Sequence, residues 1–156
     1  MPQPSEPDPA ETLTHRLVLP RDANHHGTLY AGVLLTLALE AAYATAFSSA
    51  GLTANLVLKR VLDLRCYEPV PIGTVIEIRG REVYRARAQV VVGLYGSPLS
   101  AARATPWLDA VMQFVQVDES GRPEPLAGEP EYAEADLPAP WAGLLDRTRR
   151  LLAVRN

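Results

Sequence analysis

The sequence contains little cysteine, little lysine and no excess of positive charge. Its one cysteine, Cys66, excludes a disulfide framework within the chain and a four-cysteine zinc site. Lys59 is the only lysine beside fourteen arginines, and acidic residues outnumber basic ones to give a net charge of −3. A dedicated nucleic-acid-binding protein usually carries a basic excess, so we expect no nucleic-acid partner.

Several motifs that would identify a function are also missing from the sequence. No Gly-x-Ser-x-Gly element is present, which excludes an α/β-hydrolase, and no glycine-rich loop could cradle phosphates. His25 and His26 are adjacent, but no third ligand stands near them, so we expect no metal site. The sequence does not open with a basic segment followed by an apolar run, so we expect no signal peptide and a cytoplasmic location.

The composition fits one folded domain with flexible ends. Hydrophobic residues make up 47% of the chain and charged residues 21%, which excludes a wholly disordered protein. The prolines of residues 1–10 predict a disordered arm. Residues 119–156 predict an acidic, proline-rich segment followed by a short helix from Trp141. The globular domain is therefore expected within residues 11–118.

The segment 31–50 is the longest apolar stretch, it contains a single charge, Glu40, and Gly51 follows it. Alanine and leucine dominate, so the segment predicts a helix that ends at this glycine. A helix without a polar side is expected to be buried. Its length would also fit a membrane span, but Glu40 at its centre argues against one, so we expect no membrane partner.

On either side of this helix the hydrophobic period changes to two, which predicts strands. The expected strands cover residues 13–19, 62–66, 75–80, 81–95 and 110–117. Short turns join the later strands, so we expect them to be antiparallel. A single sheet can enclose a helix only if it curls. We therefore predict an α+β fold in which a curled antiparallel sheet surrounds one long central helix.

The loop before this helix carries Asn24, Gly27 and then Ala31-Gly32 at spacings that resemble the hot-dog fold, specifically its acyl-CoA thioesterase branch. The turn at residues 69–75 resembles the turn after that family's second strand. Residues 110–118 and 121–123 resemble its last strand and exit. The resemblance covers roughly residues 17–123, and its order and spacing are more specific than any one piece.

This resemblance implies a homodimer or a dimer of dimers, with joined sheets and active sites between protomers. It implies hydrolysis of an acyl-coenzyme A thioester to free acid and coenzyme A, without a cofactor because coenzyme A is part of the substrate. In the family, a loop asparagine and a helix carboxylate face each other across the interface. Asn24 matches the asparagine, but the aspartate falls on Leu39, and Glu40 matches a glutamate that commonly follows it.

We therefore expect Asn24 and Glu40 to be catalytic, with Glu40 activating water or attacking the thioester carbonyl. Each residue has a structural alternative. Glu40 could pair with an arginine or lie at a dimer interface, and Asn24 could cap a helix or close a loop. Leu39 in place of aspartate leaves a second function open, in which the protein binds acyl-CoA as a sensor or scaffold without hydrolysing it.

Arginines at odd positions from Arg79 to Arg87 would share one face of an extended strand and could bind the phosphates of coenzyme A. Arg85 falls where the family has an arginine, and a solvated outer face of the sheet is the alternative. Cys66 is expected in the core. The expected substrate-binding residues are His26, Gly27, Thr28, Tyr30, Gly32, Thr36, Leu39, Tyr43, Arg85 and Arg87.

Overall fold

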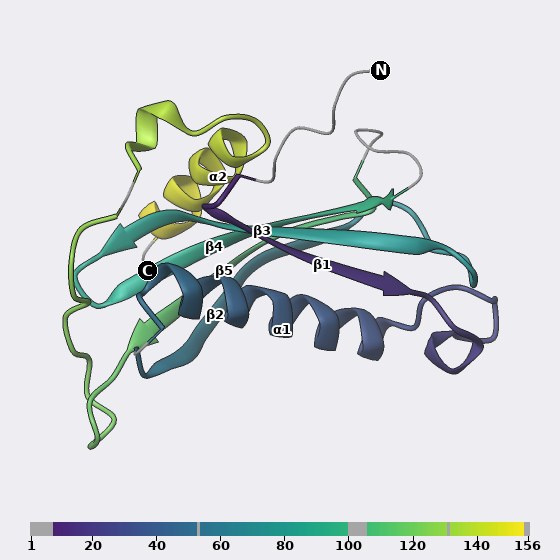
Figure 1. Cartoon of the computed structure of the whole chain (residues 1–156), viewed down its shortest axis with the longest axis horizontal. Helices are drawn as coiled ribbons and strands as arrows, with labels where there is room; N and C mark the ends of the chain where they lie inside the picture. Colours follow the sequence, from purple (N-terminus) through teal and green to yellow (C-terminus); the bar gives the residue numbers. More distant parts are fainter. Residues whose placement is uncertain (1–7, 53, 100–105, 131, 155–156) are drawn as a thin grey trace.

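The computed structural model describes residues 8–52, 54–99, 106–130 and 132–154. Five strands form one antiparallel sheet in the order β1-β3-β4-β5-β2, and two helices lie on its opposite faces (Figure 1). The strands are β1 (Glu11–Leu17), β2 (Leu56–Cys66), β3 (Val75–Ala86), β4 (Gln89–Pro98) and β5 (Leu108–Gln116). The helices are α1 (Ala31–Ser49) and α2 (Trp141–Ala153), with short 3-10 turns η1 (Pro20–Asp22) and η3 (Glu134–Asp136).

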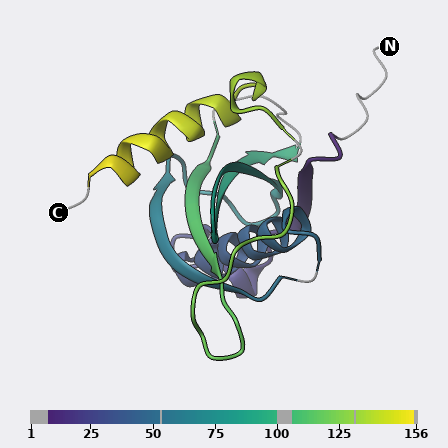
Figure 2. The same cartoon turned by 90° about the vertical axis from the view of Figure 1, so that its left-hand side faces the viewer.

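The sheet curves around α1, and α2 lies on its convex side (Figure 2). Small residues let α1 approach the sheet closely. A side chain at Gly80 of β3 would collide with the hydroxyl group of Thr45 on α1, so only glycine fits there. The predicted fold, a curled antiparallel sheet around one central helix, is confirmed.

Alternation along the strands produces two hydrophobic clusters, one on each face of the sheet. Ile76, Val92 and Phe114 belong to the cluster that α1 covers. Their strand neighbours point the other way, toward α2. That second cluster consists of Val83, Val91, Val111, Leu137, Trp141, Leu144 and Leu145.

The expectation that α1 is buried on every side is wrong for the single chain. The sheet covers one side of the helix, where Leu34, Leu37 and Ala41 are buried. The opposite side is also apolar but lies open, with Leu35 44% exposed and Tyr43 43% exposed. By length and composition α1 could span a membrane. Packing against the sheet accounts for the apolar residues on the covered side of the helix.

Three expectations about the strands are corrected. The turn between β3 and β4 lies at Arg87 and Ala88 rather than at the expected strand boundary after Gly80. It contains neither glycine nor proline. Gly96 lies inside β4, which continues past the expected strand end at residue 95, and glycine fits there because a Cβ would be 2.8 Å from the ring of Trp107. Strand β2 begins six residues earlier than expected, at Leu56. Cys66, at its end, is exposed rather than in the core.

The chain after β5 returns to the outer face of the sheet. Its last helix is attached to the first strand, because the indole N–H of Trp141 donates to a carboxylate oxygen of Glu11 at 2.7 Å. Trp141 itself is 1% exposed. Most of the expected N-terminal arm, residues 1–7, lies outside the described residues.

Candidate functional site

The loop before α1 is organised by the side chain of Asn24. Its Oδ1 accepts hydrogen bonds from the backbone N–H of His26 at 2.9 Å and of Thr28 at 3.2 Å. Its Nδ2 donates to the hydroxyl of Thr28 at 3.0 Å. Gly27 has a φ of +74°, a conformation that glycine adopts without strain. Asn24 therefore closes its own loop, the structural role foreseen as its alternative.

The same loop forms one wall of a cavity of about 320 Å³. Asn24 and Thr28 lie on one side, and Ala31 and Leu34 of the first turn of α1 lie on another. The third side is the segment after β2, with Cys66, Tyr67, Glu68, Pro69 and Val70.

The beginning of α1 is open at this cavity. Its N-cap residue is Tyr30, which makes no capping hydrogen bond through its side chain and is 55% exposed. The N–H groups of a first helical turn have no partner within the helix, and they create a partial positive charge. Within the described chain, no side chain takes up these groups. The arrangement can bind an anionic or strongly polarised oxygen beside Asn24.

Thr36, Glu40 and Tyr43 lie together on the uncovered side of α1. Their spacing of four and three residues places them above one another on the helix surface. All three are exposed, whereas Leu39 is half-buried and packs against the core. The structure thus brings these four predicted residues onto adjacent parts of one helix.

Glu40 is exposed in the single chain, although the helix that carries it was expected to be buried. Among the described residues, its carboxylate has neither an ion pair nor a hydrogen bond. The arginine pairing considered as its structural alternative is therefore not present in the described chain. Glu40 projects from the same open apolar surface as Leu35 and Tyr43.

Arg85 lies at the other end of α1. Its guanidinium donates to both carboxylate oxygens of Glu82, at 2.6 and 2.8 Å, and to the carbonyl of Ser49 at 3.0 Å. The hydrogen bond to Glu82 raises the pKa of Arg85 above its ordinary value. Both residues line a second cavity, of about 340 Å³, together with Arg81 and Tyr132. Arg85 thus binds the carboxyl end of the central helix.

The expected row of arginines on one face is wrong because β3 contains a bulge. Glu82 pairs with Val92 and Tyr84 with Val91, which leaves Val83 as an extra residue. Before the bulge, Arg79 lies near Trp141 on the α2 side of the sheet. After it, Arg85 points to α1. The bulge reverses the alternation between these two arginines.

The remaining arginines of the expected row either pair with carboxylates or lie outside the strand. Arg79 donates to Glu77 at 2.5 Å, and Arg81 donates to Asp8 at 2.6 Å. Arg87 is exposed in the turn after β3.

The predicted site residues therefore fall into separate places in one chain. His26, Gly27, Thr28, Tyr30 and Gly32 accompany Asn24 at the beginning of α1. Arg85 lies at the end of the helix, which is about 28 Å long. Glu40 lies about 14 Å along the helix from its first residue. One chain thus does not bring Asn24 and Glu40 together.

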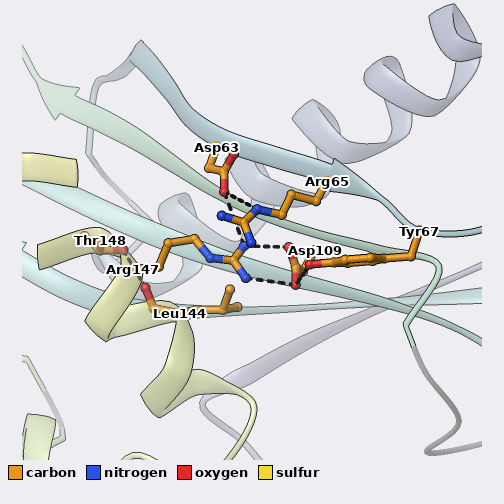
Figure 3. A network of polar contacts seen from close by, with 7 residues as sticks. All are labelled: Asp63, Arg65, Tyr67, Asp109, Leu144, Arg147 and Thr148. Carbon is orange, nitrogen blue, oxygen red and sulfur yellow. Dashed lines mark hydrogen bonds and ion pairs between the residues drawn. The ribbon is translucent and has the colours of Figure 1, made fainter. Parts of the chain in front are cut away.

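Sequence reasoning missed one polar network beside the cavity of the Asn24 loop. Tyr67, Asp109 and Arg147 come from the end of β2, from β5 and from α2, and they meet on the outer face of the sheet (Figure 3). Arg147 contacts both Asp109, at 2.6 Å, and Asp63, at 3.5 Å. In the sequence, the only sign of this network was the pair of charged residues Asp63 and Arg65 on either side of a leucine. Their spacing gave no indication that Arg147 of the last helix would contact Asp63.

An antiparallel sheet curled around one helix is the hot-dog fold, and solved structures of that fold match this chain over most of its length. An acyl-CoA hydrolase from Staphylococcus aureus, solved with butyryl-coenzyme A and coenzyme A, is 21% identical and has a TM-score of 0.75. The match covers 92% of this chain and 82% of the hydrolase. An acyl-CoA hydrolase from Bacillus cereus is 16% identical, with a TM-score of 0.75 and coverage of 94% and 86%.

A hexameric acyl-CoA thioesterase is 26% identical to this chain, with a TM-score of 0.72 and coverage of 94% and 95%. No family model and no curated protein sequence matches the chain. The resemblance predicted from the sequence is confirmed by structure: the chain has the hot-dog fold, and the solved structures that it resembles are acyl-CoA hydrolases and thioesterases.

Proposed function

We propose that this protein is an acyl-CoA thioesterase that hydrolyses an acyl-coenzyme A thioester to the free acid and coenzyme A. The observation that carries the proposal is the cavity where the Asn24 loop meets the uncapped first turn of α1, in a fold shared with acyl-CoA hydrolases. Backbone N–H groups at such a helix end can stabilise the oxyanion that develops on a thioester carbonyl.

The second part of the proposed site comes from another copy of the chain. The open side of α1 lies beside the edge strand β2, where Val57, Leu58 and Val61 are each more than 40% exposed. A two-fold axis through this apolar surface would run the two α1 helices in opposite directions. The Asn24 loop of one protomer would then approach Glu40 of its partner. A dimer is therefore the smallest assembly that completes the site.

The proposed assembly is larger than a dimer. Two of the similar solved structures are described as hexameric thioesterases. Three dimers make a hexamer, so these neighbours favour three dimers over the homodimer or dimer of dimers expected from the sequence. Each site would still require only the two chains of one dimer.

The proposed base is Glu40. The Staphylococcus aureus hydrolase was studied as alanine variants of an asparagine and of an aspartate fifteen residues after it. The same spacing from Asn24 leads to Leu39, which supports the alignment made from the sequence. Leu39 packs on the core, whereas Glu40 is about 100° further around the helix and points away from the sheet. A carboxylate there is free to face a partner chain.

The substitution at Leu39 also supports the alternative, a protein that binds acyl-CoA without hydrolysing it. A thioesterase that uses Glu40 as its base should lose turnover in Glu40→Gln, whereas a protein that only binds acyl-CoA has no turnover to lose. We expect this variant to lose 10²-fold or more in kcat, about the contribution of a general base. The assay measures thiol release from acyl-CoAs ranging from acetyl to palmitoyl and aromatic thioesters. Glu119→Gln, an exposed glutamate in the turn after β5, is the matched control.

A second substitution locates the base more closely. Leu39→Asp introduced into Glu40→Gln should restore part of the turnover if the two positions serve the same pocket. Full turnover in Glu40→Gln would remove Glu40 from the chemistry. No thiol release by the wild type on any acyl-CoA, together with measurable binding of the same compounds, would establish the binding protein instead.

Asn24 needs a variant that spares its loop. Asn24→Asp removes the amide donor but retains the oxygen that accepts from the N–H groups of His26 and Thr28. The Thr28 hydroxyl, which lies 3.2 Å from that oxygen, can donate to the carboxylate, so the loop is retained. We expect turnover to fall in Asn24→Asp with the melting temperature unchanged. Asn24→Ala should lose both turnover and loop order. Equal turnover in Asn24→Asp and wild type would assign Asn24 to the loop alone.

A further inference from the structure

Tyr67 belongs both to the wall of the Asn24 cavity and to the polar network on the far side of the sheet. It follows β2 directly and lines the cavity with Asn24 and Ala31. Its backbone N–H donates to the carbonyl of Trp107 at 2.9 Å. Its hydroxyl donates to Oδ2 of Asp109 at 2.8 Å. Although Tyr67 is 44% exposed, it is therefore attached at two points, to Asp109 of β5 and to Trp107 directly before that strand.

Asp109, the acceptor for Tyr67, is a buried carboxylate that depends on an arginine of α2. Asp109 is 7% exposed, and Arg147 donates to its two oxygens at 2.6 and 3.2 Å. The same guanidinium lies 3.5 Å from Asp63 of β2, which also accepts from Arg65 at 2.8 Å. The hydrogen bond to Asp109 raises the pKa of Arg147, and an arginine is charged in any case. Arg147 thereby joins α2 to β2 and β5 (Figure 3).

We propose that Arg147 is a positioning residue for the cavity beside Asn24, acting through Asp109 and Tyr67. This inference rests on the proposed thioesterase function. Without Arg147, the buried carboxylate of Asp109 loses its counter-ion and is driven to turn toward water. Tyr67 then loses a charged acceptor, and the segment 66–70 that forms the third wall of the cavity is released. The last helix thus influences the site without covering it.

The variants distinguish the contacts that lead from Arg147 through Asp109 to Tyr67, here called the route, from a general weakening of the packing of α2. Arg147→Gln removes the charge, and Tyr67→Phe removes only the hydroxyl at the other end of the route. Arg149→Gln is the matched control, because Arg149 is an exposed arginine of the same helix that pairs with Glu134. Leu145→Ala weakens the packing of α2 without touching a member of the network.

We expect kcat/KM for acyl-CoA to fall about tenfold in Arg147→Gln and in Tyr67→Phe, the size of one hydrogen bond to a charged group. The double variant should be no worse than the poorer single variant, because both substitutions break one route. Arg147→Lys should recover part of the loss. Leu145→Ala and Arg149→Gln should retain kcat/KM, although Leu145→Ala lowers the stability.

A second measurement does not depend on catalysis. Amide hydrogen exchange over residues 66–70 should become faster in Arg147→Gln and Tyr67→Phe and remain unchanged in Arg149→Gln and Leu145→Ala. Unchanged exchange in Arg147→Gln, or additive losses of kcat/KM in the double variant, would overturn the positioning role. A wild type without thioesterase activity would instead refute the proposed function, and the exchange measurement would still decide the role of Arg147.

Discussion

The two helices pack on opposite faces of one sheet, but only α2 has a polar side of its own. On α2, Trp141, Leu144 and Leu145 face the sheet, while Arg149 and Arg150 face water. On α1, apolar residues occur on every side, and the sheet covers only one of them. The outer face of the sheet is thus complete within one chain, whereas the inner helix leaves an apolar surface that a second copy can cover. The composition of a helix alone does not reveal how much of it its own chain buries.

The largest expected effect is on the outer face. Trp141→Ala removes a fully buried ring and its hydrogen bond to Glu11, and it should lower the free energy of unfolding by about 3–5 kcal/mol. Urea denaturation measures the loss. Arg150→Ala, on the exposed side of the same helix, should change it little. A loss below about 1 kcal/mol for Trp141→Ala would show that α2 is not needed to complete this face.

A substitution on the open side of α1 should act on assembly rather than on the fold. Leu35→Glu places a charge on the surface proposed to meet another copy, and burial of one leucine contributes about 1.5–3 kcal/mol. We expect self-association to weaken at least about tenfold, as measured by sedimentation velocity over a range of concentrations. Val154→Glu, beyond the end of α2, is the control. Unchanged association of Leu35→Glu would move the interface elsewhere.

The third prediction concerns the proposed phosphate-binding role of Arg85. Arg85→Ala should weaken coenzyme A binding by about 1–3 kcal/mol, as for a hydrogen bond to a charged group. The same change leaves Glu82 buried without its partner, so stability should fall as well. Calorimetric titration of coenzyme A into Arg85→Ala/Glu82→Gln separates the two effects. Affinity equal to that of wild type in this double variant would leave Arg85 with the role of binding the end of α1.

The smallest expected effect is a pH dependence on the outer face. Burial alone would raise the pKa of Glu77, but hydrogen bonds from Arg79 and His15 more than offset it, so the pKa lies below its ordinary value. A carboxyl with a depressed pKa stabilises the fold above its unfolded pKa and loses that contribution as the pH falls through its folded pKa.

Urea midpoints measured between pH 7 and pH 3 test this expectation. Wild type should exceed Glu77→Gln at pH 7, and the difference should shrink as the solution is acidified. A difference that stays constant over this range would show that the charge of Glu77 does not stabilise the fold.

The sequence predicted the architecture well because it depends on periodicity. The helix was predicted at 31–50 and is found at Ala31–Ser49, and the antiparallel order of the strands is confirmed. Two of the expected strand ends fall at or beside a glycine. Gly80 and Gly96 resemble turn residues, but they lie within strands where Thr45 and Trp107 leave no room for a side chain. That requirement is a contact across the fold and is invisible along the chain.

The candidate site was predicted in part. The loop residues from Asn24 to Gly32 lie together, because their neighbourhood is local in sequence. The network of Tyr67, Asp109 and Arg147 joins three elements distant in the sequence, so no spacing could indicate it. Whether Asn24 and Glu40 act together stays a prediction, since it depends on a second chain.

The extra residue Val83 in β3 has a consequence for how this protein is compared with other proteins of the same fold. On either side of the bulge the same parity of residue number denotes opposite faces of the sheet. An alignment that omits this extra residue shifts the register by one and pairs Arg85 with a position on the opposite face of the sheet. Transfer of a residue's role between proteins of this fold therefore requires strand pairing, because residue counting alone does not show which face of the sheet a residue occupies.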